Sequence, residues 1–156
     1  MDRVLDRLFV GATSDLSGAT PLRALGFSAV LDLRDGLRDP PGPPGVEVLR
    51  IQNRDGDPWR PEDVERALAF IHEHVRIGRV LVACAAGMSR SASIAVAYLV
   101  RCGWDPPSAF ECVRAARPEV APVEAMIRVA LGVAQPGART EVLGAESVRA
   151  VTGGVK

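Results

Sequence analysis

The feature that most constrains this chain is a pair of apolar segments joined by a loop of small residues. Arg79–Cys84 (RVLVAC) is apolar after its first residue and is typical of a strand buried at the centre of a parallel sheet. Ser91–Cys102 (SASIAVAYLVRC) is apolar nearly all round, as expected of a buried helix. A buried strand followed directly by a buried helix indicates a layered α/β domain.

The rest of the chain alternates between strand and helix in the same way. Predicted strands are Leu8–Gly11, Ser28–Leu33 and Val46–Ile51, and predicted helices are Pro21–Gly26, Pro61–Ile77, Pro106–Arg117 and Pro122–Val133. This order predicts a three-layer α/β/α fold, with a central, mostly parallel sheet of four or five strands flanked by helices. We assign residues 1–133 to one domain. Residues 134–156 lose periodicity and gain glycine, which predicts a weakly structured tail.

Composition narrows the functional classes. The chain has 156 residues, 47% of them hydrophobic, and a formal net charge of zero, so it has no general attraction to nucleic acid or to an anionic membrane. The N-terminal residues MDRVLDRLFVGA carry charges and resemble no signal peptide, and each long uncharged stretch is too short to span a bilayer. Cys84, Cys102 and Cys112 lack a disulfide framework spacing. We therefore expect a soluble, cytoplasmic monomer with reduced thiols.

The loop between the two apolar segments predicts an anion site. Five small or uncharged residues must turn around the start of the helix, and Gly87 admits conformations that a Cβ atom would forbid. Backbone N–H groups that face inward at a helix start form a cradle of the size of a phosphate group. The predicted phosphate-binding residues are Ala85, Ala86, Gly87, Met88, Ser89 and Arg90.

Reactive and anion-binding side chains lie next to this predicted cradle, at Cys84, Arg90 and Ser91. The dipoles that attract an anion also favour the thiolate form of Cys84, and a thiolate is a strong nucleophile. Arg90 can place two N–H donors on two oxyanion oxygens, and Ser91 can donate a hydrogen bond to the sulfur as it leaves. These groups fit phosphoryl transfer to sulfur, followed by hydrolysis of the thiophosphate.

The sequence Cys84–Ser91 (CAAGMSRS) matches the C-x-x-G-x-x-R-S motif of cysteine-dependent protein phosphatases, and the chain resembles their dual-specificity branch. Segments 8–35 and 108–127 resemble the opening and closing elements of that family, so the likeness covers residues 8–131. The resemblance implies a protein tyrosine phosphatase-like fold. It also implies hydrolysis of phosphotyrosine, and of phosphoserine or phosphothreonine, through a phosphocysteine without metal or cofactor.

The same resemblance implies a general acid, an aspartate in the loop before the long amphipathic helix. Asp55 and Asp57 are the candidates in the loop 52–60, and Asp55 fits the family register better. Asp35 ends another strand and can face the same cleft, but no acid of the family stands at its position. We therefore predict that Cys84, Arg90, Asp55 and Ser91 are the catalytic residues, with Asp57 as the alternative acid.

Two positions depart from the family pattern and leave alternatives open. Ala83 stands where the family has a histidine, and Val123 stands where it has asparagine after proline. The first departure raises the alternative of a catalytically weak pseudophosphatase that binds phosphopeptides. A rhodanese-like sulfurtransferase also uses a loop cysteine and is a second alternative. Because the loop residues other than Arg90 carry no charge, a singly phosphorylated protein is favoured over a polyphosphorylated inositol lipid.

No metal site is predicted. His72 and His74 lie two residues apart on a predicted helix, so their side chains point in different directions and cannot share an ion. We expect both imidazoles to be solvated.

Overall fold

Five strands form a single mixed sheet with β5 (Arg79–Ala83) at its centre. The computed structural model describes residues 1–36 and 42–135 of the chain. The other strands are β1 (Asp2–Arg3), β2 (Leu8–Gly11), β3 (Phe27–Asp32) and β4 (Glu47–Arg50), in the spatial order β1-β2-β5-β3-β4. β1 runs antiparallel to β2, and all other neighbours are parallel. The mostly parallel sheet expected from the sequence is confirmed.

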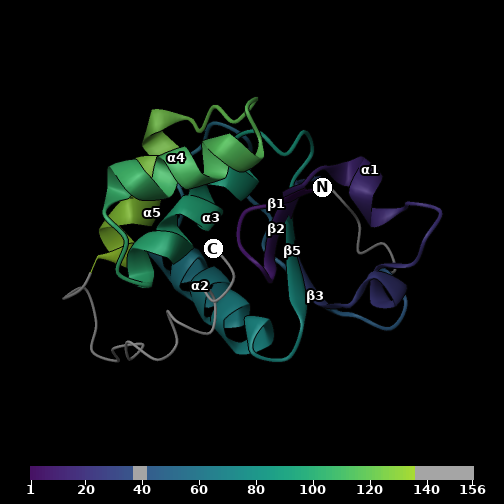
Figure 1. Ribbon diagram of the computed structural model, residues 1–156. Helices are drawn as coiled ribbons and strands as arrows, with labels where there is room; N and C mark the ends of the chain where they lie inside the picture. The colour runs from purple at the N-terminus through teal and green to yellow at the C-terminus, as the bar shows by residue number, and fades with distance from the viewer. Residues whose placement is uncertain (37–41, 136–156) are drawn as a thin grey trace.

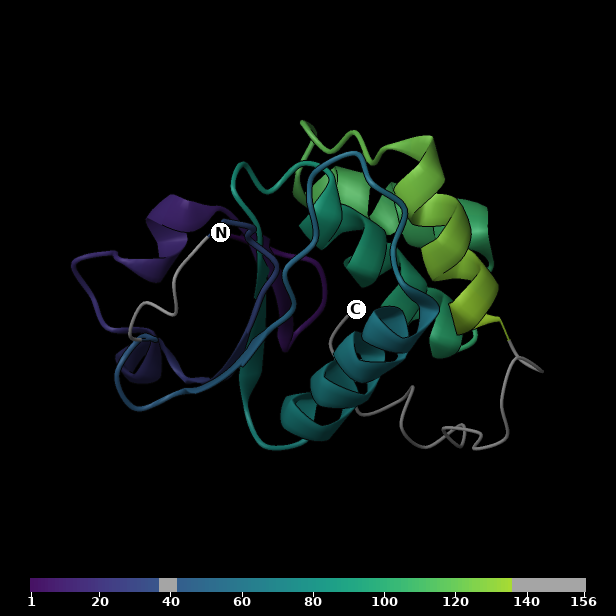
Figure 2. The ribbon, with the colours of Figure 1, turned by 180° about the vertical axis from the view of Figure 1, so that it is seen from behind.

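The two faces of the sheet carry different layers (Figures 1 and 2). One face is covered by the four long helices α2 (Pro61–Val75), α3 (Arg90–Arg101), α4 (Pro106–Ala116) and α5 (Glu124–Ala134). The other face carries only α1 (Thr13–Leu16) and the 3₁₀ helix η1 (Leu22–Leu25). The three-layer prediction is therefore correct, with one thick and one thin helical layer.

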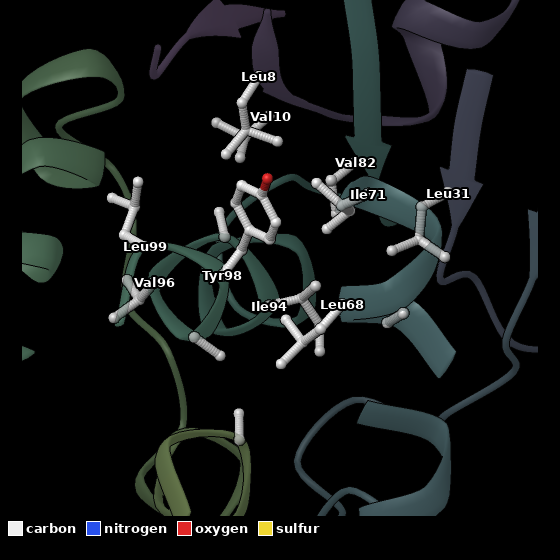
Figure 3. Packing of buried hydrophobic residues seen from close by; sticks show 14 of the residues in the cluster. Leu8, Val10, Leu31, Leu68, Ile71, Val82, Ile94, Val96, Tyr98 and Leu99 are labelled. Atoms are coloured by element: carbon white, nitrogen blue, oxygen red, sulfur yellow. The ribbon is translucent and has the colours of Figure 1, made fainter. Parts of the chain in front are cut away.

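β5 is apolar without alternation because it is buried on both faces. Val80 and Val82 pack into the large core beneath the long helices, whereas Leu81 and Ala83 belong to a second cluster on the opposite face. In the large core, the ring of Tyr98 from α3 lies beside Leu8 and Val10 of β2 (Figure 3). Ten successive residues of α3, from Ser91 to Val100, are buried, as the apolar sequence of this segment requires.

The predicted elements agree with the observed ones to within one or two residues at nearly every boundary. β1 and α1 were not predicted, because two and four residues are too short to show a periodicity. The predicted tail 134–156 lies outside the described residues, apart from Ala134 and Gln135 at the end of α5. No helix in the described part of the chain has the length and hydropathy of a membrane span.

The prediction that both histidines are solvated is wrong for His74. Its side chain is buried, with Nδ1 2.9 Å from the carbonyl oxygen of Phe70 and Nε2 3.0 Å from Glu47 Oε2. The carbonyl oxygen and an ionised Glu47 are both acceptors, so these contacts favour the protonated ring, in which both nitrogens donate. Burial by itself disfavours the charge, but the bonds to Glu47 and Phe70 outweigh it and raise the pKa of His74.

This raised pKa predicts how stability depends on pH. The contribution of His74 is fully present below the pKa of an unfolded histidine, about 6.5, and is lost as the pH rises through the higher folded value. Urea unfolding at pH 6 and pH 8 should therefore show a larger loss of stability for the wild type than for His74→Gln. Equal losses in the two proteins would contradict the assignment.

Candidate active site

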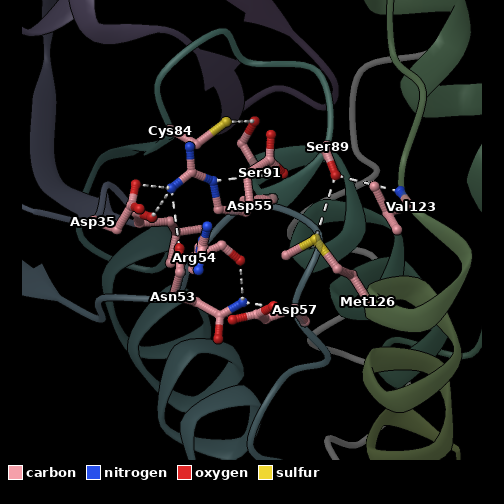
Figure 4. Close-up of polar contacts among 12 residues, drawn as sticks. Asp35, Asn53, Arg54, Asp55, Asp57, Cys84, Ser89, Ser91, Val123 and Met126 are labelled. Atoms are coloured by element: carbon pink, nitrogen blue, oxygen red, sulfur yellow. Dashed lines mark hydrogen bonds and ion pairs between the residues drawn. The ribbon is translucent and has the colours of Figure 1, made fainter.

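The topology brings four loops to one edge of the sheet. β2, β3, β4 and β5 are parallel, and Gly11 and Asp32 both pair with Ala83 at the carboxyl end of β5. The loop 84–89 after β5 therefore lies between the segments that follow β2, β3 and β4. Ligands bind at this edge in open parallel sheets, and the predicted site residues gather here (Figure 4).

The carbonyl groups of the loop 84–89 are held from the outside. Thr13 N donates to Ala85 O at 3.1 Å, Arg117 Nη2 donates to Ala86 O at 3.0 Å, and Ala121 N donates to Met88 O at 2.9 Å. In a trans peptide the N–H group points away from the C=O group, so the amides that follow these carbonyls face the inside of the loop. Gly87 N lies 3.2 Å from Cys84 Sγ and shows this directly. The loop therefore has the inward-facing amide that the predicted anion cradle requires.

Gly87 is required by both backbone conformation and space. Its φ is +70°, and a Cβ atom there would lie 2.7 Å from Gly11 O and 3.0 Å from Arg117 Nη2. A side chain at this position would therefore strain the loop and push it away from β2.

Arg90 is the first residue of α3 and is buried, with 3% of its surface exposed. Its Nη1 lies 3.2 Å from Leu33 O, 2.8 Å from Asp35 Oδ1 and 3.0 Å from Asn53 O, so one edge of the guanidinium is saturated. Its Nε is buried and makes no hydrogen bond within the described part of the chain. A buried N–H without an acceptor is rare, and here it marks the place for an anion.

Asp35 belongs to this site, although the sequence indicated only that it can face the cleft. The hydrogen bond from Arg90 is the main cause of the lowered pKa of Asp35, so its carboxyl group stays ionised. An ionised group bound to the phosphate-binding arginine cannot donate a proton at neutral pH. Asp35 therefore orients Arg90 and is excluded as the general acid.

Of the two candidate acids, Asp55 is the one that reaches the site. Its Oδ1 lies 3.9 Å from Arg90 Nε, and 57% of its side chain is exposed. Asp57 is exposed, and its backbone bonds within the loop, where its N–H donates to Arg54 O and its carbonyl oxygen accepts from the Asn53 side chain. The geometry favours Asp55, in agreement with the register expected from the sequence.

The serines at either side of Arg90 have different surroundings. Ser91 Oγ lies 3.3 Å from Cys84 Sγ, within reach of a hydrogen bond to sulfur. Ser89 Oγ points the other way, donating to Met126 Sδ at 3.4 Å and accepting from Val123 N at 3.3 Å. Ser89 can therefore offer a phosphate group only its backbone amide.

Trp59 supports the site through a contact that the sequence did not reveal. It is buried, and its Nε1 donates to Ser93 Oγ at 2.9 Å, while Ser93 Oγ donates to Arg90 O at 2.8 Å. This chain of bonds ties the loop that carries Asp55 to the first turn of α3. Across residues 1–36 and 42–135, no three His, Cys, Asp or Glu side chains gather in a way that could hold a metal ion.

The packing around Gly87 predicts the effect of one methyl group. We expect Gly87→Ala to bind orthophosphate at least about tenfold more weakly than the wild type in calorimetric titrations, because an alanine in this conformation costs about 1–2 kcal/mol before any clash. Gly103→Ala is the matched control, since Gly103 also has a positive φ, of 100°, but open space around it. Similar affinities in the two variants would refute the cradle.

Comparison with known proteins agrees with this geometry. Residues 8–131 match the family model described as "Dual specificity phosphatase, catalytic domain". The chain is 38% identical over 129 residues to mouse (Mus musculus) Dual specificity phosphatase 28, covering 77% of this chain and 75% of that protein. It is 30% identical over 127 residues to human (Homo sapiens) Dual specificity protein phosphatase 16, covering 77% of this chain but only 18% of that protein.

Among solved structures, the crystal structure of human DUSP28 matches with a TM-score of 0.76 and 29% identity, covering 86% of this chain and 95% of that one. The chain spans only about a fifth of the length of some relatives, 18–20% for three of them. The match nevertheless covers the whole sheet from β2 onward and the loop 84–89. The chain belongs to the dual-specificity phosphatase family.

Proposed function

We propose that this protein hydrolyses phosphate monoesters on proteins, at phosphotyrosine and also at phosphoserine or phosphothreonine, through a phosphocysteine. The observation that carries the proposal is the buried Nε of Arg90, which makes no hydrogen bond within the described residues and has Asp55 Oδ1 3.9 Å away, at a loop whose Gly87 amide faces Cys84 Sγ. Such a site is complementary to a tetrahedral dianion held against a nucleophile.

In the first step, the Cys84 thiolate attacks phosphorus, an S–P bond forms and the P–O bond to the leaving group breaks. The amides of the loop and Arg90 hold the three equatorial oxygens, where negative charge is spread in the transition state. Asp55, protonated, gives its proton to the leaving oxygen. Its exposed position at the end of a loop, 3.9 Å from Arg90 Nε, lets it reach a bound ester from the solvent side.

In the second step, water attacks the phosphocysteine. Asp55, now ionised, takes a proton from the water, the O–P bond forms and the S–P bond breaks. Ser91, 3.3 Å from the sulfur, donates a hydrogen bond to the departing thiolate. The phosphate then leaves, Cys84 returns to the thiolate, and Asp55 is again protonated.

The substrate we propose is a singly phosphorylated protein. The exposed residues on the rim of the loop, Ala85, Ala86 and Met88, carry no charge, and 40% of Met88 is exposed. An additional phosphate group would meet no cation on this part of the rim, whereas Met88 can pack against an apolar or aromatic side chain.

Two other functions make different demands on the same residues. A pseudophosphatase would bind phosphopeptides without turnover, and Ala83 in place of histidine is the observation that motivates it. The intact set of Cys84, Arg90 and Ser91 favours turnover instead. A sulfurtransferase would not need an arginine with one edge saturated and the other unpaired, so the state of Arg90 also argues against that class.

Hydrolysis of p-nitrophenyl phosphate tests the proposal. We expect release of p-nitrophenol by the wild type and none by Cys84→Ser, because serine is a far weaker nucleophile at neutral pH. Binding of a phosphopeptide without turnover from pH 5 to pH 8 would instead support the pseudophosphatase. Formation of a persulfide on Cys84 from thiosulfate would support the sulfurtransferase.

The role of Asp55 is separable from that of Asp57. Asp55→Asn should lower kcat on a phosphotyrosine peptide by about 10²-fold or more, the usual loss of a general acid. The loss should be smaller on p-nitrophenyl phosphate, whose leaving group needs less protonation. Asp57→Asn, the matched control in the same loop, should stay near wild type. A larger loss in Asp57→Asn would transfer the role to that residue.

A further inference from the structure

The peptide group between Ala86 and Gly87 connects the nucleophile to a residue far from it in sequence. On one side, Gly87 N–H points at Cys84 Sγ, 3.2 Å away. On the other side, the carbonyl oxygen of the same peptide, Ala86 O, accepts a bond of 3.0 Å from Arg117 Nη2. Because the peptide is planar and trans, the carbonyl cannot leave Arg117 without turning the N–H away from the sulfur.

Arg117 is itself held in a fixed position. Its Nη1 donates to Asp2 Oδ2 at 2.5 Å, which joins the residue after α4 to the first strand of the sheet. Only 16% of the side chain is exposed, and its Nε is buried. The guanidinium is therefore held in place and makes a charge-assisted hydrogen bond to Ala86 O at an exposed position of the loop.

A cation on the carbonyl end of a peptide polarises the N–H at its other end, because hydrogen bonds in series strengthen one another. Within the described part of the chain, Cys84 Sγ contacts the Gly87 N–H and Ser91 Oγ. The preceding residue, Ala83, has no polar side chain to assist. The strength and direction of the Gly87 N–H bond therefore weigh heavily on the charge state of the sulfur.

We propose that Arg117 is a positioning residue that acts through the Ala86–Gly87 peptide to favour the thiolate form of Cys84. It touches neither the sulfur nor the substrate. The inference rests on the proposed function, because a thiolate at Cys84 is useful only to a nucleophile. Its test does not depend on that function, since the reactivity of the thiol can be measured without any turnover.

Other charged groups surround Arg117 and Cys84, and the substitution at position 117 leaves them in the protein. Arg90 at the start of α3 faces the cradle, with Asp35 and Asp55 beside it. Asp2 on β1 binds Arg117, and Asp15 of α1 lies close enough to feel its charge. A variant at position 117 therefore changes one member of a known set of charges.

The experiment measures alkylation of Cys84 by iodoacetamide between pH 4 and pH 9, with tryptic mass spectrometry to follow this cysteine alone. We expect Arg117→Gln to move the midpoint of the rate profile upward by about 0.5–1 pH unit, a fraction of the energy of one hydrogen bond to a charged group. At a pH below the midpoint, the same shift appears as a fall of about three- to tenfold in rate. Arg114→Gln, which removes an exposed arginine of α4, should leave the midpoint unchanged.

High salt distinguishes an effect carried through the Ala86–Gly87 peptide from a long-range electrostatic effect of the Arg117 charge. An effect carried by the hydrogen bond to Ala86 O should persist in 1 M NaCl, whereas a long-range charge effect should fade there. Arg117→Lys keeps the charge but cannot bind Asp2 and Ala86 with two nitrogens of one fork, so it should shift the midpoint in the same direction, by less. Should Arg117→Gln fail to fold, Arg117→Lys decides the question.

An unchanged midpoint in the folded variants, an equal shift in Arg114→Gln, or a shift that disappears in high salt would overturn the inference. None of these outcomes concerns hydrolysis. A wild type that releases no p-nitrophenol would instead overturn the proposed function, and would leave the effect of Arg117 on the thiol measurable.

Discussion

The outward bonding of the loop carbonyls is the constraint on which the site depends. A loop whose amides all face an anion must leave its carbonyls on the other side, and a buried carbonyl without a donor costs free energy. Three parts of the chain supply those donors, at Thr13, Arg117 and Ala121. The cradle is thus built by its outer neighbours as much as by its own sequence.

The surroundings of Arg90 place two similar groups, the carboxyl groups of Asp35 and Asp55, in different environments. The three bonds of its Nη1 hold the guanidinium in place, which leaves Nε buried without a hydrogen bond and 3.9 Å from Asp55 Oδ1. Asp35 accepts a hydrogen bond from Nη1, which lowers the pKa of its carboxyl group, whereas the exposed Asp55 lies beyond hydrogen-bonding distance of the guanidinium. The two aspartates near this arginine therefore have different environments, and the proposed function gives them different roles.

The sequence predicted those features that a local pattern of residues determines. The apolar run of β5, the buried α3 and the spacing of Cys84 and Arg90 are local, and the structure has them where they were expected. The contacts of Asp35 with Arg90 and of Trp59 with Ser93 could not be predicted, because these partners lie far apart along the chain and meet only through the parallel topology. His74 was misjudged for a similar reason. His74 lies on an amphipathic helix, which suggested a solvated ring. The structure places the Glu47 carboxylate of β4 3.0 Å from its Nε2, a contact that the local sequence does not indicate.

β1 shows how fold and site depend on one another. Two residues that pair antiparallel with β2 add little to the core, and nothing in their sequence signals a strand. Their position nevertheless brings Asp2 to Arg117, and Arg117 to the back of the peptide that faces the sulfur. An edge strand of this kind is retained for the geometry it imposes rather than for the area it buries. The catalytic loop therefore depends on residues at opposite ends of the domain, which no local motif can encode.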